Sequence, residues 1–411
     1  IYPKRRWSIR TKHCLRTSLH RKSQLNQLRL KKNGSRRFKV LVVGAFPEEE
    51  KKIYGGFVTV CGALIDSSFE KCFNLVLIDS TQASNPRPSL FKRAYRALIR
   101  FCLYNFSLFN EKPNAVLIFT ASGIGLLEKG LMGRSAQFMG IPNLMFPGGG
   151  YLLKNYDFSY CMRLFAEIAL KKADKILCQG RQWQNFAVHN LGFKINNAPI
   201  VENWTATESL LEIGRNRNYR KSPKAKLRLL FVGWLDKEKG VLEILEAISS
   251  SDLKEKVTIE FVGKGNVDKE AEEIIYRNGL SKTVVFRGWL QGKELHDAYA
   301  RAEVFLLPSW MEGLPNAMVE AMSAGLVPLV SAVGNVPSCL EDGKNGFLLE
   351  PKNPVSIQKA LEQILADELT IEKFGKEAHF FAEKNFATEI AVQKLTCVIM
   401  DAIEEKNSSR L

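Results

Sequence analysis

Residues 304–325 read Val304-Phe-Leu-Leu-Pro-Ser-Trp-Met-Glu312-Gly-Leu-Pro-Asn-Ala-Met-Val-Glu320-Ala-Met-Ser-Ala-Gly325. The apolar run at the start is typical of a parallel strand that is covered on both faces. Pro315 suits the first turn of a helix, where its missing N–H costs nothing, and Gly325 suits the end of that helix. The stretch therefore predicts a buried strand, a loop and a helix of about ten residues.

The same succession of apolar run and helical pattern recurs on both sides of this stretch. The runs span residues 38–44, 75–78, 115–119 and 175–178 in the first half, and 227–233, 257–263, 283–286, 304–308 and 327–330 in the second. Alternating strands and helices imply right-handed crossovers and doubly wound parallel sheets. We therefore predict an α/β fold in which two Rossmann-like domains face each other across a cleft, with five strands in the second domain.

A polar, basic segment without periodicity interrupts this pattern near the middle of the 411-residue chain, a length that suits two domains. We expect a helix at the C-terminus to pack back on the first domain. The predicted divisions are a basic tail at 1–37, an N-terminal Rossmann-like domain at 38–205, a linker at 206–226, a C-terminal Rossmann-like domain at 227–385 and the returning helix at 386–411.

The net charge of +16 is concentrated in residues 1–37, which hold thirteen Lys and Arg and no acidic residue. The rest of the chain carries 46 basic and 43 acidic side chains, so it is nearly neutral. The tail has too few apolar residues to offset the entropy of ordering, and we expect a disordered appendage rather than a nucleic-acid-binding arm. A targeting segment, a tether to an anionic surface and non-native upstream sequence stay open as interpretations of it.

The cysteines and the apolar runs indicate in which cellular compartment the protein is expected. Eight cysteines are scattered without a Cys-x-x-Cys pair, which indicates neither a zinc site nor a redox motif and favours free thiols in a reducing compartment. No stretch approaches the ~20 apolar residues of a membrane-spanning helix, and no secretory hydrophobic region stands at the start. We expect a cytoplasmic protein, with peripheral contact to the inner membrane face left open.

The loop after Pro308 is the strongest candidate for chemistry, because ligands of doubly wound sheets bind beyond the carboxyl ends of the strands. The following helix begins with free, positively polarised N–H groups that suit a diphosphate. Glu312 lies on the loop and Glu320 lies inside the helix. Two glutamates at this spacing without a neighbouring helix start would be interpreted as solvated surface residues. Beside a helix start, one carboxylate can hold a ribose diol and the other a sugar hydroxyl.

Several ordered motifs accompany this loop. They are Phe231-Val-Gly-Trp-Leu-Asp-Lys-Glu-Lys239-Gly240, Phe261-Val-Gly-Lys-Gly265, Phe286-Arg-Gly288, Glu341-Asp-Gly-Lys-Asn-Gly-Phe-Leu348 and Pro351. Together they resemble the nucleotide-sugar domain of family-four retaining glycosyltransferases of the GT-B fold, the glycosyl transferases group 1 type. The N-terminal half is similar more loosely, at Tyr54-Gly55-Gly56 and Val201-Glu-Asn203-Trp.

The resemblance implies a role for each matching residue. Glu312 would contact the transferred sugar, and Lys239 would neutralise the diphosphate as the glycosidic bond breaks; these two are the candidate catalytic residues. Glu320 would bind the ribose hydroxyls, and the turn at 287–289 would line the base. The candidate donor-binding residues are Glu320, Gly313, Leu314, Pro315, Asn316, Gly55, Gly56, Arg287, Gly288, Trp289 and Gly263.

The resemblance also implies a hexosyltransferase-type enzyme that retains anomeric configuration and acts in surface polysaccharide or glycan assembly. The sequence holds no Asp-x-Asp, the pair with which transferases of the other common fold hold a metal ion. An ammonium group and a helix N-terminus in a dry cleft can stabilise the charge on a leaving diphosphate. We expect no cofactor and no metal; the expected partners are a nucleotide-sugar donor and a saccharide or lipid-linked acceptor, not nucleic acid.

Three positions depart from the family's pattern. Trp234 stands where an Arg usually follows the Gly of the strand motif, so half of the usual cationic pair is missing, and Lys237 or Arg287 is the candidate replacement. None of the five His lies in residues 146–150, where many members carry one. Ser338 stands where an acidic residue is common. Trp234 puts the expected cationic contact with the phosphates in question. The missing His leaves no residue assigned to the chemistry of the acceptor.

Residues 87–104 combine basic and apolar side chains at helical spacing. One predicted face holds Phe91, Tyr95, Leu98 and Ile99, with Lys92, Arg93, Arg96 and Arg100 around it. One interpretation is a core-packing helix with a solvated basic rim. The other is an interfacial helix that faces an anionic membrane surface, which would suit an acceptor on a lipid carrier.

Two other functions are compatible with this architecture. A nucleotide-sugar epimerase needs acid–base residues on both sides of the sugar, and the scarcity of His near the cleft loops disfavours it. A non-catalytic partner subunit is left open by Trp234 and disfavoured by the intact Glu312, Glu320 and Lys239. A dinucleotide site is a weaker hypothesis, because the turn at 263–265 lacks the third Gly of that fingerprint.

Overall fold

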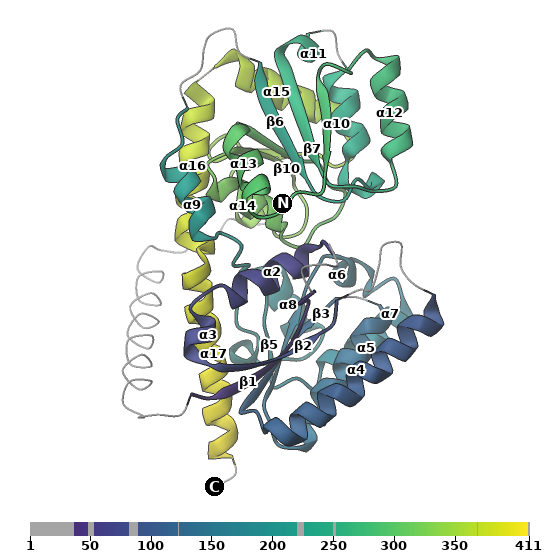
Figure 1. Ribbon diagram of the computed structural model, residues 1–411, viewed down its shortest axis with the longest axis vertical. Helices are drawn as coiled ribbons and strands as arrows, with labels where there is room; N and C mark the ends of the chain where they lie inside the picture. Colours follow the sequence, from purple (N-terminus) through teal and green to yellow (C-terminus); the bar gives the residue numbers. More distant parts are fainter. Residues whose placement is uncertain are drawn as a thin grey trace.

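The computed structural model describes residues 37–47, 53–81, 89–121, 123–219, 226–249, 252–367 and 369–409. The basic tail up to residue 36 therefore lies outside the described residues. The chain forms two all-parallel sheets, one in each half (Figure 1). The N-terminal sheet has the spatial order β2 (Asn74–Asp79), β1 (Lys39–Gly44), β3 (Ala115–Thr120), β4 (Asn143–Pro147), β5 (Lys175–Ile176).

The N-terminal strands are buried on both faces, as their continuous apolar runs predict. In β1, Val40 and Val42 enter the hydrophobic cluster on one side of the sheet, and Leu41 and Val43 enter the cluster on the other side. This division follows from the period of two in a strand. Each face therefore needs its own layer of helices.

Two sets of helices cover these faces. The first is α2 (Gly56–Ile65), α3 (Phe69–Cys72) and α17 (Thr388–Ser408). The second comprises α4 (Leu90–Glu111), α5 (Ile124–Phe138), α6 (Tyr151–Asn155), α7 (Tyr160–Leu170) and α8 (Arg181–His189). The last helix, α17, runs along the N-terminal domain and buries Leu395 and Ile399 against it (Figure 1). A short 3-10 turn, η2 (Ile195–Asn197), precedes the crossing to the second domain.

The C-terminal sheet has the order β11 (Phe347–Leu349), β10 (Val327–Ser331), β9 (Val304–Leu307), β6 (Leu227–Val232), β7 (Val257–Val262), β8 (Val284–Gly288). Its helices are α10 (Val241–Ile248), α11 (Leu253–Lys256), α12 (Asp268–Arg277), α13 (Gly292–Arg301), α14 (Asn316–Ser323), α15 (Pro354–Ala366) and α16 (Leu369–Phe386), with 3-10 turns η3 (Lys237–Lys239) and η4 (Val336–Ser338). These two parallel sheets confirm the predicted α/β fold.

Two details differ from the sequence-based expectation. The second sheet has a sixth strand, β11, which is too short at three residues to stand out as an apolar run. The predicted linker at 206–226 contains a helix, α9 (Glu208–Arg215), whose Leu210 and Leu211 are buried in the core of the C-terminal domain. The apolar side chains of α9 fill barely two turns, so their period is obscured by the basic residues that follow.

The topology fixes where the loops of the second domain converge. Strand β6 lies between β7 and β9, so the chain winds in opposite directions on its two sides. At such a switch point the loops after the two central strands separate and leave a crevice at the carboxyl ends. The loops after β6 and β9 are those that carry Lys239 and Glu312. In the described part of the chain no helix combines the length and apolarity needed to cross a bilayer.

Candidate functional site

The two candidate catalytic residues meet at this switch point. Lys239 Nζ lies 2.6 Å from Oε1 of Glu312, and the Ser309 hydroxyl donates to the same oxygen over 2.8 Å. The Glu312 side chain is 12% exposed and that of Lys239 is 29% exposed. The ammonium group is thus held by a carboxylate, while part of the lysine side chain is exposed to solvent, from which an anionic ligand could approach.

A glycine makes this approach of the two loops possible. Lys239 ends the turn η3, and Gly240 follows with a φ of 76°, in the left-handed region that favours glycine. A Cβ at Gly240 would lie 2.4 Å from the carbonyl oxygen of Pro308, the residue after β9. Helix α10 then begins and buries Val241 and Ile244 in the core. The side chain of Lys239 is therefore positioned by a rigid strand–turn–helix unit.

The start of α14 joins the two domains. Asn316 donates through Nδ2 to the Gly56 carbonyl over 2.9 Å, and its Oδ1 accepts from Asn203 at 2.5 Å. Asn203 is buried and also donates to the Leu314 carbonyl over 3.0 Å. Pro315 is the residue that caps the helix rather than a residue of its first turn, and α14 has eight residues instead of about ten.

Glu320 occupies an enclosed position within α14. It is 6% exposed, and its Oε2 accepts a hydrogen bond of 2.8 Å from the hydroxyl of Tyr299 in α13. Burial raises the pKa of Glu320 to about 7, and the hydrogen bond from Tyr299 opposes part of that rise. The hydrogen bond from Tyr299 involves Oε2 alone, so the other oxygen, Oε1, can accept from a hydroxyl group.

Backbone of the N-terminal domain closes on the Glu312 loop. A Cβ at Gly150 would lie 2.4 Å from the Glu312 carbonyl oxygen, so only glycine fits at this contact. Gly56 begins α2 directly after Gly55, and its carbonyl meets Asn316 as described above. The paired glycines therefore lie beside the start of α14, and the donor-binding role that the resemblance implies for them stays a prediction.

The turn after β8 carries an aromatic cluster. The rings of Trp289 and Tyr54 stack with centroids 4.6 Å apart and an interplanar angle of 6°, although they belong to different domains. The Trp234 ring meets Trp289 edge-on at 4.7 Å. The position that usually holds an Arg in the resembling family therefore lies in an interdomain aromatic cluster, Tyr54–Trp289–Trp234.

Two predicted donor-binding residues have other contacts in this structure. The Arg287 guanidinium pairs with both carboxylate oxygens of Glu260, at 3.2 and 3.1 Å, and the Gly288 carbonyl accepts a hydrogen bond of 2.8 Å from the backbone N–H of Gly263. Gly263 has a φ of 143°, and a Cβ there would lie 1.8 Å from the Gly233 carbonyl oxygen. That glycine is required for the close packing of the strand ends.

Sequence reasoning missed several residues of the site. Tyr299 lies in a helix without any motif, and its contact with Glu320 depends on the packing of α13 against α14. Gln179 is buried without a hydrogen-bond partner for its Oε1, close to Gly313. Ser309 stood within the quoted stretch and could have been inferred from its spacing of three residues from Glu312. Among the described residues, no three His, Cys, Asp or Glu side chains are grouped as a metal site would require.

Comparison with known proteins finds a family match in the C-terminal half of the chain. Residues 213–380 match the family described as Glycosyl transferases group 1. An uncharacterized glycosyltransferase of Methanocaldococcus jannaschii is 26% identical over 56% of this chain and 59% of its own length. A sulfoquinovosyl transferase of Arabidopsis thaliana is 34% identical over 38% of this chain and 30% of its own length. The chain thus spans less than two thirds of these curated relatives.

Solved structures share the whole two-domain arrangement. HepE from Anabaena, crystallised with UDP, has a TM-score of 0.65 at 15% identity and matches 89% of this chain and 100% of its own. The sucrose-phosphate synthase of Thermosynechococcus elongatus has a TM-score of 0.66 at 16% identity and matches 90% of this chain and 100% of its own. At these identities the likeness establishes the fold alone, which is GT-B.

Proposed function

We propose that this chain, a GT-B fold whose residues 213–380 form a Glycosyl transferases group 1 domain, moves a hexosyl group from a nucleotide-sugar donor to a hydroxyl of a saccharide or lipid-linked acceptor. The observation that carries the proposal is the 2.6 Å pair between Lys239 and Glu312 at the topological switch point. A cation, a carboxylate and a helix start converge there, and these are the groups that a sugar diphosphate requires.

The chemistry assigns each group a separate part of the donor. Lys239 turns from Glu312 to the diphosphate and stabilises the negative charge that develops there as the sugar–phosphate bond breaks. Glu312 is then free to accept hydrogen bonds from the sugar, and Oε1 of Glu320 accepts from the ribose. The acceptor hydroxyl forms the new glycosidic bond and gives its proton to the departing diphosphate, which leaves as free nucleoside diphosphate. The chain's own cation and the N-terminus of α14 supply the stabilisation, so no metal is required.

A structural neighbour suggests which donor to test first. HepE has been crystallised with UDP and with UDP-glucose, which supports a uridine diphosphate sugar as the first donor to test. Retention of anomeric configuration and a place in polysaccharide or glycan assembly are supported by the resemblance to family-four transferases. A cytoplasmic location accords with the free cysteines among the described residues.

The test is release of free nucleoside diphosphate from a panel of nucleotide sugars, with and without candidate acceptors. We expect acceptor-dependent release that Glu320→Ala abolishes, while Glu377→Ala, a change at an exposed glutamate on α16, leaves it intact. Unchanged release in Glu320→Ala would refute the site. An epimerised sugar without transfer would favour an epimerase, and thermal stabilisation by nucleotide without turnover would favour a non-catalytic subunit.

A further inference from the structure

We propose that the outer face of α4 docks this protein onto an anionic lipid surface. The outer face consists of Phe91, Tyr95, Leu98, Ile99, Leu103, Phe106 and Phe109. These side chains are between 41% and 90% exposed. Scattered exposed apolar residues need no explanation, but a continuous set on one helix is typical of an interaction site.

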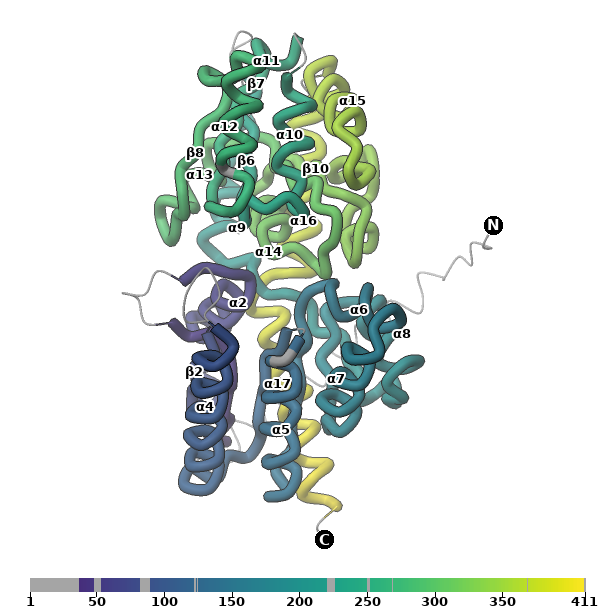
Figure 2. Tube along the Cα trace, turned by 90° about the vertical axis from the view of Figure 1, so that its right-hand side faces the viewer, coloured from purple at the N-terminus to yellow at the C-terminus, as the bar shows by residue number. Residues whose placement is uncertain are grey.

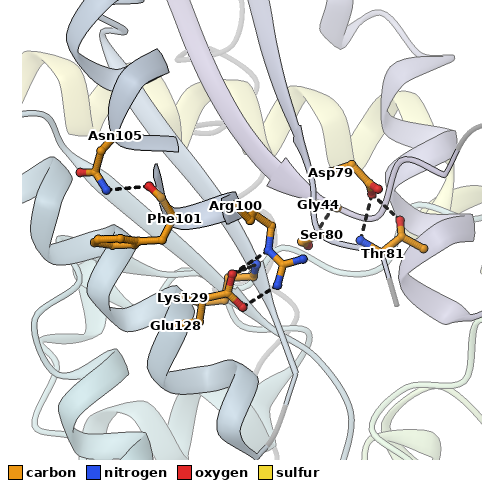
Figure 3. Close-up of polar contacts among 9 residues, drawn as sticks. All are labelled: Gly44, Asp79, Ser80, Thr81, Arg100, Phe101, Asn105, Glu128 and Lys129. Carbon is orange, nitrogen blue, oxygen red and sulfur yellow. Dashed lines mark hydrogen bonds and ion pairs between the residues drawn. The ribbon is translucent and has the colours of Figure 1, made fainter. Parts of the chain in front are cut away.

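The opposite face of α4 packs against the core of the N-terminal domain. Tyr104 and Leu108 are buried, and the Tyr104 hydroxyl donates to the Met132 carbonyl of α5 over 2.8 Å. The Arg100 guanidinium binds both carboxylate oxygens of Glu128 in α5, at 2.6 and 2.7 Å (Figure 3). The helix is thus held by its inner face, and the side chains of the outer face lie largely outside that packing.

The described part of the segment 87–104, from residue 89 on, bears on one of its two interpretations. The predicted apolar face at Phe91, Tyr95, Leu98 and Ile99 is solvent-exposed, so the core-packing interpretation of that face is wrong. Arg100, predicted as part of the basic rim, is instead an internal ion-pair partner of α5. At 100° per residue the outer face is centred opposite Tyr104 and Leu108, so α4 is apolar on two sides.

The positive charge of α4 indicates which kind of partner its outer face binds. Lys92, Arg93 and Arg96 are exposed beside the apolar side chains, and no acidic residue occurs in α4 before Glu111 at its end. A second copy of the chain would bring like charges together across a symmetric contact. An anionic bilayer complements the face instead, because its headgroups attract the cations and its acyl boundary accepts the aromatic and aliphatic side chains.

The position of α4 connects this surface with the cleft. In a crossover after a parallel strand, the helix begins at the carboxyl edge of the sheet, so the cationic end of α4 lies toward the other domain (Figure 2). Figure 2 also shows α4, α5 and α7 side by side as one outer layer. Delivery of a lipid-linked acceptor to the cleft from this surface rests on the proposed function, whereas docking itself does not.

The test measures docking without donor or acceptor, so its failure is distinct from failure of the transferase. The full chain is sedimented with vesicles of phosphatidylcholine alone or mixed with phosphatidylglycerol, at low and high salt. We expect binding to the mixed vesicles only, weakened by salt because screening shortens electrostatic reach to about 8 Å at physiological ionic strength. Absence of binding to mixed vesicles at low salt would overturn the proposal.

Variants in the same full chain separate α4 from the basic tail, which all of them retain. Phe91→Ser/Phe106→Ser/Phe109→Ser and Lys92→Glu/Arg93→Glu/Arg96→Glu are each expected to weaken partition at least about tenfold. Tyr276→Ser, at an exposed aromatic residue of α12, is the control and should bind like the unaltered chain. Equal binding by all variants would assign docking to another surface. A concentration-dependent dimer that the serine variant abolishes would assign the face to a second copy.

Discussion

Lys239 Nζ and Oε1 of Glu312 lie 2.6 Å apart although 73 residues separate them in the sequence. The contact exists because β6 and β9 are neighbours in the sheet and their loops meet at its carboxyl edge. This pair holds each partner in place and neutralises its charge. A diphosphate would compete with Glu312 for the ammonium group, which couples donor binding to release of the carboxylate.

Lys239→Met removes the cation and keeps most of the side-chain length. We expect nucleoside diphosphate release to fall roughly a hundredfold or more, because stabilisation of the leaving group is lost where its charge develops. Initial rates at saturating donor measure the effect. Lys344→Met, at an exposed lysine that pairs with Glu341 on the surface, is the matched control. Equal rates in both variants would remove Lys239 from the mechanism.

Glu320→Gln should raise stability in a pH-dependent way. The pKa of Glu320 is raised by burial to about 7, above its usual value of 4.5, so the folded state holds its proton more tightly than the unfolded state. The ionised group therefore lowers the free energy of unfolding progressively between about pH 4.5 and pH 7, by roughly 3 kcal/mol in total. Glutamine cannot ionise and avoids this loss.

Urea denaturation at several pH values checks that expectation. The variant should match the original chain below about pH 4.5 and exceed it above pH 7, while donor turnover is lost. A constant difference across this range would mean that Glu320 does not titrate as its burial requires. Tyr299→Phe provides a second readout, because removal of the hydrogen bond to Oε2 should raise the pKa of Glu320 further.

Gly150→Ala tests the close approach of the N-terminal domain to the Glu312 loop. The added Cβ would lie 2.4 Å from the Glu312 carbonyl oxygen, so the two backbones must separate. We expect kcat/KM to fall about tenfold or more, because small displacements in an active site misalign the reacting groups. Gly62→Ala in α2, where an added Cβ has no neighbour within 4 Å, should leave kcat/KM unchanged and raise helix stability slightly.

Tyr54→Ala removes one ring of the Tyr54–Trp289–Trp234 cluster. An aromatic pair contributes about 1 kcal/mol beyond its buried area, so loss of this interdomain contact should reduce kcat/KM roughly fivefold. Tyr54→Phe keeps the stacked ring and is expected to behave like the original chain. If both variants lose activity equally, the hydroxyl rather than the stack is what matters.

The sequence predicted the part of the site that is local. Glu312, the start of α14 and Lys239 each belong to a short motif whose strand and turn are recognisable, and the parallel topology brings the motifs together. Contacts from helices that carry no sequence motif could not be predicted. The hydrogen bond from Tyr299 to Glu320 is an example. The ion pair of Arg287 with Glu260 was also missed, because both residues alternate outward from neighbouring strands and no motif links them.

Periodicity also has a limit that α4 illustrates. The spacing of Phe91, Tyr95, Leu98 and Ile99 predicts one apolar face, but it cannot say whether that face turns inward or outward. The inner face is set by Tyr104 and Leu108, which lie later in the helix and pack on α5. A helix with two apolar sides therefore looks like an ordinary core helix until its neighbours are known.

A crystal structure of the protein with a bound nucleoside diphosphate tests the account most directly. We predict that a phosphate oxygen lies within about 3 Å of Lys239 Nζ and of a backbone N–H at the start of α14, with Glu312 released from the lysine. The ribose hydroxyls should meet Glu320. A nucleotide bound elsewhere, or a phosphate in the cleft that leaves the Lys239–Glu312 pair intact, would contradict the proposed site.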